Sequence, residues 1–209
     1  MSKARKKRSG KAVAQKFYSN GRVRRQAAPS ATLTRTKYRK ALPELRRDFE
    51  DRCAYCMRYI CTEREMEVDH FDPRRKKDKI QVYSNLFLAD RHCNGAKGDV
   101  WPSASDRARG CEFIDCCKEV DYGNVIFEDP LTHRLVGTTP AAIYHIEMID
   151  LDNPGLVKAR EHRSKVLSTL AEAEKSKDPA IKAIVAKLED EKKYLIPPIP
   201  PPPGSWVMT

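Results

Sequence analysis

The chain has 209 residues, 40% of them hydrophobic and 33% charged, which is enough for one domain with a real core plus extensions. It has no apolar run of about 18 residues, so we expect no membrane span and a cytoplasmic location. The net charge of +11 belongs to the N-terminus: residues 1–40 carry 14 Lys or Arg and no acidic residue, and the rest carries 26 basic and 29 acidic residues.

Residues 1–40 also lack periodic apolar spacing, which predicts a basic, largely irregular and disordered arm. Such an arm has four alternative interpretations: a segment that contacts nucleic-acid phosphates, a nuclear-type localisation signal, a transit peptide, or a solvated tail without a specific role. We favour phosphate contacts because of the motifs below. The arm residues expected to bind nucleic acid are Arg5, Lys6, Lys7 and Arg8.

The first half of the folded region predicts short elements. "LPELRRDFEDR", with Pro43 near its start, favours a helix over 42–52. A strand is expected to end near Val68, followed by a polar loop with a charge run, "FDPRRKKDK", and by the short apolar stretch "NLFLAD".

The second half predicts a β-hairpin and helices. "NVIFED" and "HRLVGTT" are separated by "PLT", as in a hairpin. Helices are expected to begin near Pro140, at Asn153-Pro154 and at Asp178-Pro179, since Asn and Asp are good N-caps and proline suits the first turn. The final "IPPIPPPPGSW" favours polyproline II, either as a flexible tail or as a docking peptide for an aromatic groove.

The cysteines indicate a metal site. Seven cysteines in a chain without a signal peptide favour reduced thiols over a disulfide framework. Cys53 and Cys56 have the C-x2-C spacing that lets two thiolates face one Zn²⁺, and Cys93 is a third candidate. The fourth ligand stays open, because Asp90, His92 or a later cysteine among Cys111, Cys116 and Cys117 can each complete the set.

"CAYC", "EVDHFDP" and "SNLFLADRHCNGAKGD", in this order across roughly residues 50–100, resemble the HNH endonuclease family. The resemblance implies a ββα-metal fold, hydrolysis of DNA phosphodiester bonds, a catalytic Mg²⁺ or Mn²⁺ and a structural Zn²⁺. It implies that Asp69 and Asn94 bind the catalytic ion, that His70 is the general base, that Asn85 holds the loop and that Lys97 lies near the scissile phosphate.

The chemistry is consistent with these roles. A neutral imidazole can take a proton from water near pH 7, and a divalent ion offsets the charge that develops on the phosphate and the leaving oxygen. Neighbouring residues on a regular strand face opposite sides. We therefore expect the strand to be distorted at its end if Asp69 and His70 both serve one phosphate.

A looser resemblance covers "NVIFEDPLTHRLVG" and "IEMIDLDNPGLVKAREHR". These segments are similar to the C-terminal extension of small bacterial HNH proteins that accompany an ATPase in anti-phage defence, of the Septu and retron type. The resemblance implies a nuclease subunit with an ATPase partner.

The overall expectation is an α+β protein. It has a basic arm (1–40), a ββα-metal HNH core with a zinc-clamped flank (41–110), a hairpin and mostly helical extension (111–195), and a Pro-rich tail (196–209). Its expected function is a metal-dependent DNA endonuclease. One alternative is a non-catalytic zinc module that binds nucleic acid, which needs the cysteines and the arm but not the Asp-His-Asn-Asn set. Another is an adaptor that acts through its proline-rich end.

Overall fold

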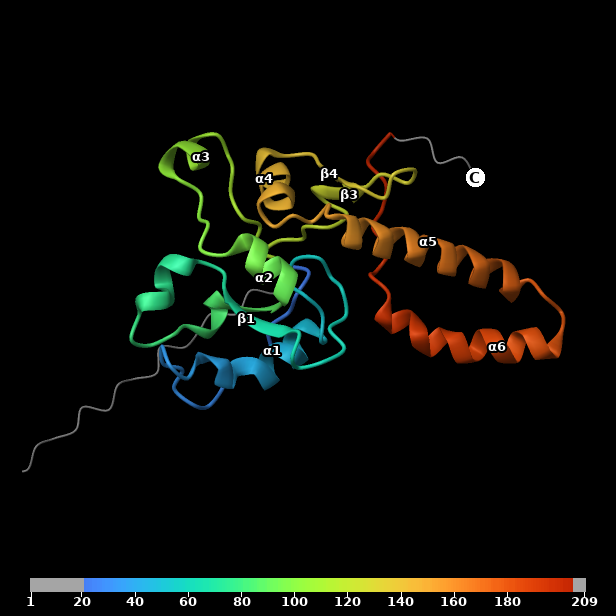
Figure 1. The fold of residues 1–209 in the computed structure, drawn as a ribbon, viewed down its shortest axis with the longest axis horizontal. Coiled ribbons are helices and arrows are strands. Elements are labelled where there is room, and N and C mark those ends of the chain that lie inside the picture. The colour runs from blue at the N-terminus through green and yellow to red at the C-terminus, as the bar shows by residue number, and fades with distance from the viewer. Residues whose placement is uncertain (1–20, 205–209) are drawn as a thin grey trace, which may run out of the picture.

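The computed structural model describes residues 21–204 (Figure 1). The first half of this range contains a small αββα unit. Its elements are α1 (Leu42–Phe49), β1 (Met66–His70), β2 (Leu86–Asp90) and α2 (Arg91–Lys97). The helix expected over 42–52 and the two expected strands are thus present, with α1 ending at Phe49 because the next two residues, Glu50 and Asp51, have positive φ.

β1 and β2 pair antiparallel over their whole length, from Met66↔Asp90 to His70↔Leu86. All five residues of β2 are buried, so this strand forms the centre of the unit. α1 packs on β2, and α2 packs on both strands (Figure 1). This is the ββα arrangement expected from the sequence.

The second half builds a separate hairpin and a set of helices. The elements are α3 (Ala104–Ala108), β3 (Ile126–Glu128), β4 (Leu135–Gly137), α4 (Pro140–Met148), α5 (Pro154–Glu174) and α6 (Pro179–Glu189). β3 and β4 pair antiparallel, which confirms the predicted hairpin. The last three helices each begin at a proline, as predicted. The predicted caps Asn153 and Asp178 are present, and the side chain of Thr139 caps α4.

α5 and α6 lie side by side as a long hairpin that projects from the rest of the molecule (Figure 1). α5 is tied down at its N-terminal half by buried arginines: Arg163 pairs with Glu128 of β3 and Arg160 with Asp152. None of the described helices, α5 included, is long and apolar enough to cross a membrane.

The described part of the predicted basic arm, residues 21–40, has little regular structure before the short 3-10 helix at Tyr38–Ala41, yet it packs on the core. Val23 and Leu33 are buried, and the Arg25 guanidinium donates to the carbonyl oxygens of Tyr83 and Leu86. The predicted contacts Arg5, Lys6, Lys7 and Arg8 lie outside the described residues.

The proline-rich segment also has a partner within the chain. Ile196 and Ile199 are buried, and the Pro200 carbonyl accepts from the backbone N–H of Glu128 in β3. Up to residue 204, this segment therefore extends the hydrogen bonding of β3 and covers part of the core, a role that its composition alone did not predict.

Candidate active site and metal centre

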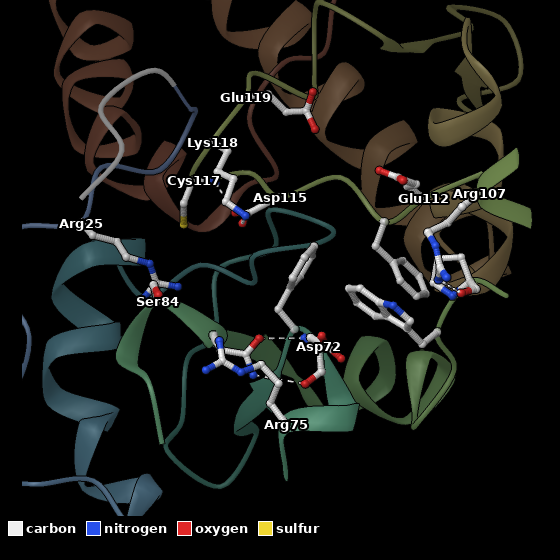
Figure 2. Close-up of a pocket in the computed structure, with 15 residues that line it drawn as sticks. Arg25, Asp72, Arg75, Ser84, Arg107, Glu112, Asp115, Cys117, Lys118 and Glu119 are labelled. Carbon is white, nitrogen blue, oxygen red and sulfur yellow. Dashed lines mark hydrogen bonds and ion pairs between the residues drawn. The ribbon is translucent and has the colours of Figure 1, made fainter. Parts of the chain in front are cut away.

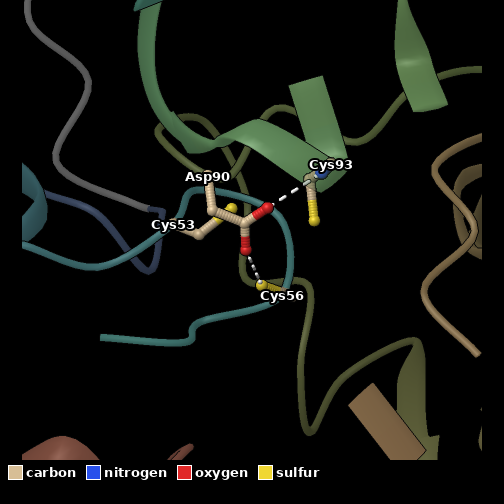
Figure 3. A group of neighbouring side chains, drawn as sticks. All are labelled: Cys53, Cys56, Asp90 and Cys93. Atoms are coloured by element: carbon tan, nitrogen blue, oxygen red, sulfur yellow. Dashed lines mark hydrogen bonds between the residues drawn. The ribbon is translucent and has the colours of Figure 1, made fainter. Parts of the chain in front are cut away.

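Three cysteines and one aspartate gather beside the ββα unit. Cys53 and Cys56 lie on the tight turn after α1, where the N–H groups of Cys53 and Met57 donate to the carbonyls of Arg58 and Cys53. Asp90 ends β2 and Cys93 lies in the first turn of α2. Ligand atoms of these four residues all lie within 4.8 Å of one another, and all four side chains are buried (Figure 3).

Asp90 joins the helix to this cluster. Its Oδ1 accepts from the backbone N–H of Cys93, which caps α2, and its Oδ2 lies 3.2 Å from Cys56 Sγ. His92, the alternative ligand from the sequence, lies on the surface instead, with Nε2 2.9 Å from Asn153 Nδ2. Cys116 and Cys117 are buried outside the cluster, so the structure brings Asp90 to the fourth position.

The donor set suits zinc. Three thiols and one carboxylate can form a closed tetrahedron, with Zn–S distances of about 2.3 Å. Burial opposes ionisation of Cys53, but hydrogen bonds from the thiols of Cys56 and Cys93 lower its pKa well below the usual value. Because no position is left for substrate, an ion here would clamp the turn to α2 rather than take part in a reaction.

The second centre lies at the end of β1, where consecutive residues face different partners. The Asp69 side chain turns towards α2. Its Oδ2 lies 2.9 Å from Lys97 Nζ and also accepts from the Tyr55 hydroxyl. Lys97 Nζ donates at 3.0 Å to the backbone carbonyl of His70 as well, and its side chain is fully buried. Lys97 therefore lies in the interior, where its ammonium already has two partners.

The His70 side chain takes the opposite direction. Its Nε2 lies 2.7 Å from Gln81 Oε1, and the Gln81 amide nitrogen donates to the Asp78 carbonyl, so the amide presents its oxygen to the imidazole. The Tyr38 ring packs on the imidazole at 4.6 Å between centroids. β1 stays paired through His70, so the expected distortion at the strand end is not present.

His70 lines a cleft of about 600 Å³ whose other walls are strongly basic. The charged lining residues are Arg35, Arg74, Lys76, Lys77 and Asp99. Lys76 pairs with Asp99 and Arg74 with Asp72, whereas the Arg35 side chain makes no ion pair among the described residues. The cleft places the imidazole of His70, which is 5% exposed, beside several positive side chains. This arrangement suits an anionic substrate.

Asn85 fixes the loop that follows His70. Its Oδ1 accepts from the Asp72 N–H at 2.9 Å and its Nδ2 donates to the Asp72 carbonyl at 3.2 Å. Asp72 in turn caps the short 3-10 helix Pro73–Lys77, which carries the basic wall of the cleft. The structure thus gives Asn85 the geometry expected of the residue that holds the loop.

Asn94 lies on α2, three residues before Lys97, so both project from neighbouring positions of the helix. Its amide makes no hydrogen bond to any described residue, and Asp69 Oδ1 also makes none, although Oδ2 is engaged by Lys97 and Tyr55. Carboxylate and amide oxygens suit a hard divalent cation such as Mg²⁺ or Mn²⁺. Asp69 and Asn94 thus carry oxygen donors of the type that such an ion prefers, but the Asp69 carboxylate is paired with Lys97 and faces away from His70.

Comparison with known proteins agrees with this geometry. A family model described as HNH endonuclease matches residues 53–100. No curated protein and no solved structure matches the chain. The matched segment begins at Cys53 and extends past Lys97, so it contains the cysteine cluster and most of the second centre, but not Arg35 and Tyr38. It supports nuclease activity, a nucleic-acid substrate and binding of a divalent metal for this part of the chain.

Four residues of the two centres were not singled out from the sequence: Tyr38, Tyr55, Gln81 and Arg35. Tyr55 lies between the two cysteines of the C-x2-C pair, which is a local signal. Gln81 and Tyr38 have no such signal, because their contacts with His70 join segments that are distant in sequence.

Proposed function

We propose that this protein is a metal-dependent HNH-type endonuclease that hydrolyses phosphodiester bonds of DNA. The observation that carries the proposal is the position of His70, which lies on the wall of a basic cleft with one ring nitrogen held by Gln81. The family match over residues 53–100 supports the same reaction class.

His70 is suited to act as general base. Because Gln81 Oε1 can only accept, the imidazole proton lies on Nε2, and Nδ1 keeps its lone pair for a proton from water. Burial lowers the pKa of His70 below its usual value, partly offset by the bond to Gln81. The ring is therefore neutral at pH 7 and ready to take that proton.

The cleft would hold the scissile phosphate beside His70. Arg35 and Lys77 are exposed cations on its wall, and Arg74 and Lys76 add positive charge although each has an acidic partner. Positive groups fixed in place stabilise the extra negative charge of the transition state without having to reorient.

Asp69 and Asn94 are the proposed ligands of Mg²⁺ or Mn²⁺, a role that requires the Asp69 carboxylate to leave Lys97 and turn towards the cleft. The ion would stabilise negative charge on the phosphate and the leaving oxygen. Lys97 acts as a positioning residue, since its ammonium links the Asp69 carboxylate to the His70 backbone. Asn85 positions the basic loop through Asp72. A zinc ion on Cys53, Cys56, Asp90 and Cys93 would be structural.

The test is nicking of supercoiled plasmid by purified, zinc-loaded protein with Mg²⁺ or Mn²⁺, against the same reaction without added Mg²⁺ or Mn²⁺. We expect cleavage only with the ion, and a loss of about 10²- to 10⁴-fold in His70→Ala. His162→Ala is the matched control, because His162 is exposed on α5. Cleavage by His70→Ala at the wild-type rate would contradict the proposal.

The second candidate is a zinc module that binds nucleic acid without cutting it. The ion pair between Lys97 and Asp69 favours this alternative, because a cation already neutralises the carboxylate. Tight binding of DNA by folded, zinc-loaded protein that cuts neither DNA nor RNA with any divalent ion would support it.

We further propose that the chain works as the nuclease subunit of a bacterial defence complex with an ATPase. The support is the sequence resemblance of the extension and the projecting α5–α6 hairpin, where Ile181, Ile184 and Leu188 are exposed along α6. Co-purification with the candidate ATPase, lost on replacing these three residues by Ser but not on replacing the exposed Leu131, tests this role.

A further inference from the structure

A second cavity, of about 450 Å³, lies across the loop that follows His70 (Figure 2). Some side chains of this loop line the second cavity and others line the basic cleft at His70. Phe71, Asp72 and Arg75 line the second cavity, whereas His70 and Arg74 line the basic cleft. His70 and Phe71 are adjacent in the chain but line different cavities. A nucleic-acid strand with a phosphate at His70 would therefore pass close to the second cavity.

Three aromatic rings form the apolar part of this cavity. Phe71 meets Trp101 edge to face at 5.7 Å between centroids, and Trp101 lies 6.0 Å from Phe113. The Arg74 guanidinium lies over the Trp101 ring at 4.9 Å, so one residue connects the aromatic wall to the basic cleft. Aromatic side chains bind nucleobases by stacking or edge contacts, and such contacts are open to all four bases.

The rim of the cavity carries equal numbers of basic and acidic side chains. Four basic and four acidic side chains line the cavity, and the labelled ones surround it in Figure 2. Arg107 and Glu112 lie on one side, Arg75 and Asp72 on another. A rim with equal numbers of both charges has no preference for an ion of one sign. It suits a neutral ligand that both donates and accepts hydrogen bonds.

The wall also holds two polar atoms without partners. The indole Nε1 of Trp101 and the Nε of Arg25 are buried and make no hydrogen bond to any described residue. Arg25 as a whole is 7% exposed and extends towards Ser84 at the cavity (Figure 2). Both atoms lie beneath the surface of the wall, so a ligand in the cavity would reach them only if neighbouring side chains moved aside.

We propose that this cavity binds an unpaired nucleobase of the nucleic-acid substrate. The inference rests on the proposed nuclease function and narrows its substrate to strands with a single-stranded or extruded base next to the scissile phosphate. A nucleobase is flat, nearly neutral and carries both donors and acceptors, which matches the aromatic rings and the rim with equal numbers of basic and acidic side chains.

The test measures base binding without cleavage. Trp101 and Trp206 are the two tryptophans, so Trp206→Phe leaves Trp101 as the reporter. In a His70→Ala, Trp206→Phe protein without added divalent ion, a single-stranded DNA oligonucleotide is titrated against an abasic deoxyribose-phosphate oligomer of the same length and charge. We expect saturable quenching of Trp101 by the base-containing strand, with at least about tenfold tighter binding than the abasic oligomer.

Equal affinity and equal fluorescence change for the two strands would overturn the proposal. In that case plasmid nicking by the wild type would still uphold the nuclease. Selective quenching together with absent nicking would uphold the base cavity and contradict the nuclease. The two claims therefore fail separately.

Variants locate the binding in this cavity. Phe113→Leu removes one ring and should reduce the affinity for the base-containing strand about tenfold. Phe113 is buried, so Glu112→Gln on the exposed rim provides a second variant that keeps the core, and it should change the relative affinities for the four homopolymers. Glu172→Gln, the same charge change on exposed α5, should leave them unchanged. Base selectivity that survives both cavity variants would contradict the assignment.

Discussion

The two centres of the ββα unit differ in how much room they leave for another molecule. The cluster of Cys53, Cys56, Asp90 and Cys93 is closed, with every side chain buried. The cleft at His70 is open and lined by cations. Both depend on the same two strands and α2. A few short elements can therefore provide one site for stability and another for chemistry.

The strand β1 separates the roles. Asp69 faces inwards to Lys97 and Tyr55, whereas His70 faces the cleft and Gln81. Because alternate residues of a strand point to opposite sides, adjacent positions meet different environments. Substitution of Lys97 should mainly affect folding and substitution of His70 mainly activity, whereas substitution of Asp69 should affect both, because its carboxylate pairs with Lys97 and is a proposed ligand of the catalytic ion.

The largest effect is expected at the cysteine cluster. Cys93→Ser removes one ligand and should abolish tight zinc binding, and since structural zinc sites contribute on the order of 10 kcal/mol to folding, the free energy of unfolding should fall by at least about 5 kcal/mol. Urea unfolding together with zinc analysis measures both. Cys61→Ser is the control, because Cys61 is exposed and outside the cluster. A Cys93→Ser protein as stable as Cys61→Ser would mean that the cluster binds no structural ion.

The buried ion pair comes next. Lys97→Met leaves the Asp69 carboxylate buried beside an apolar side chain, which should lower the free energy of unfolding by about 3–5 kcal/mol. The double variant Lys97→Met, Asp69→Leu should recover much of this loss, since no unpaired charge remains. Lys187→Met, on exposed α6, is the control. A single variant with unchanged stability would show that the pair does not hold the inner side of β1.

The pH dependence of stability tests a third buried group. Burial lowers the pKa of His145 to about 4, against an ordinary value of 6.5. Between these two values the unfolded chain binds a proton that the folded protein excludes, so stability falls as the pH drops from about 6.5 to 4, by about 3 kcal/mol in total.

Unfolding free energies at pH 7 and pH 4.5 measure this dependence. His145→Gln should reduce the difference between the two pH values, whereas His162→Gln, at an exposed position, should not. An unchanged difference in His145→Gln would contradict the assignment of the neutral, buried imidazole.

The smallest effect is expected at Gln81. Gln81→Met removes the acceptor that keeps the proton on His70 Nε2, so fewer molecules have Nδ1 free, and kcat/KM for cleavage should fall about tenfold. The same bond raises the pKa of His70, so the acid limb of the rate profile should move to lower pH. Gln26→Met, at an exposed position, is the control. An unchanged profile would remove Gln81 from the positioning of the base.

Local signals in the sequence predicted the helix starts and the strand pair. The caps at Thr139, Asn153 and Asp178 with their prolines mark helix starts, and the C-x2-C spacing places two thiols on one turn. Such features depend on residues a few positions apart. Long-range contacts could not be inferred in this way. Gln81 and Tyr38 meet His70 from other segments.

The surroundings of Lys97 also depend on long-range contacts. The resemblance implies a place near the scissile phosphate, and the structure places the buried ammonium between the Asp69 carboxylate and the His70 carbonyl. The proline-rich segment likewise suggests a free peptide, whereas Ile196 and Ile199 anchor it to the core. In both cases the surroundings of the residue depend on tertiary packing, which a short stretch of sequence does not show.

The measurement that tests the division most directly is the cleavage rate and the unfolding free energy of the same His70→Ala preparation, beside wild type and Cys93→Ser. We predict that His70→Ala loses about 100-fold or more in rate and keeps the zinc content of the wild type. Its unfolding free energy should fall by only about 1–3 kcal/mol, from the lost contacts of the buried ring with Tyr38 and Gln81, whereas Cys93→Ser should lose more stability and its zinc. A His70→Ala protein that keeps its rate, or that loses as much stability as Cys93→Ser, would contradict the separation of chemistry from structure at β1.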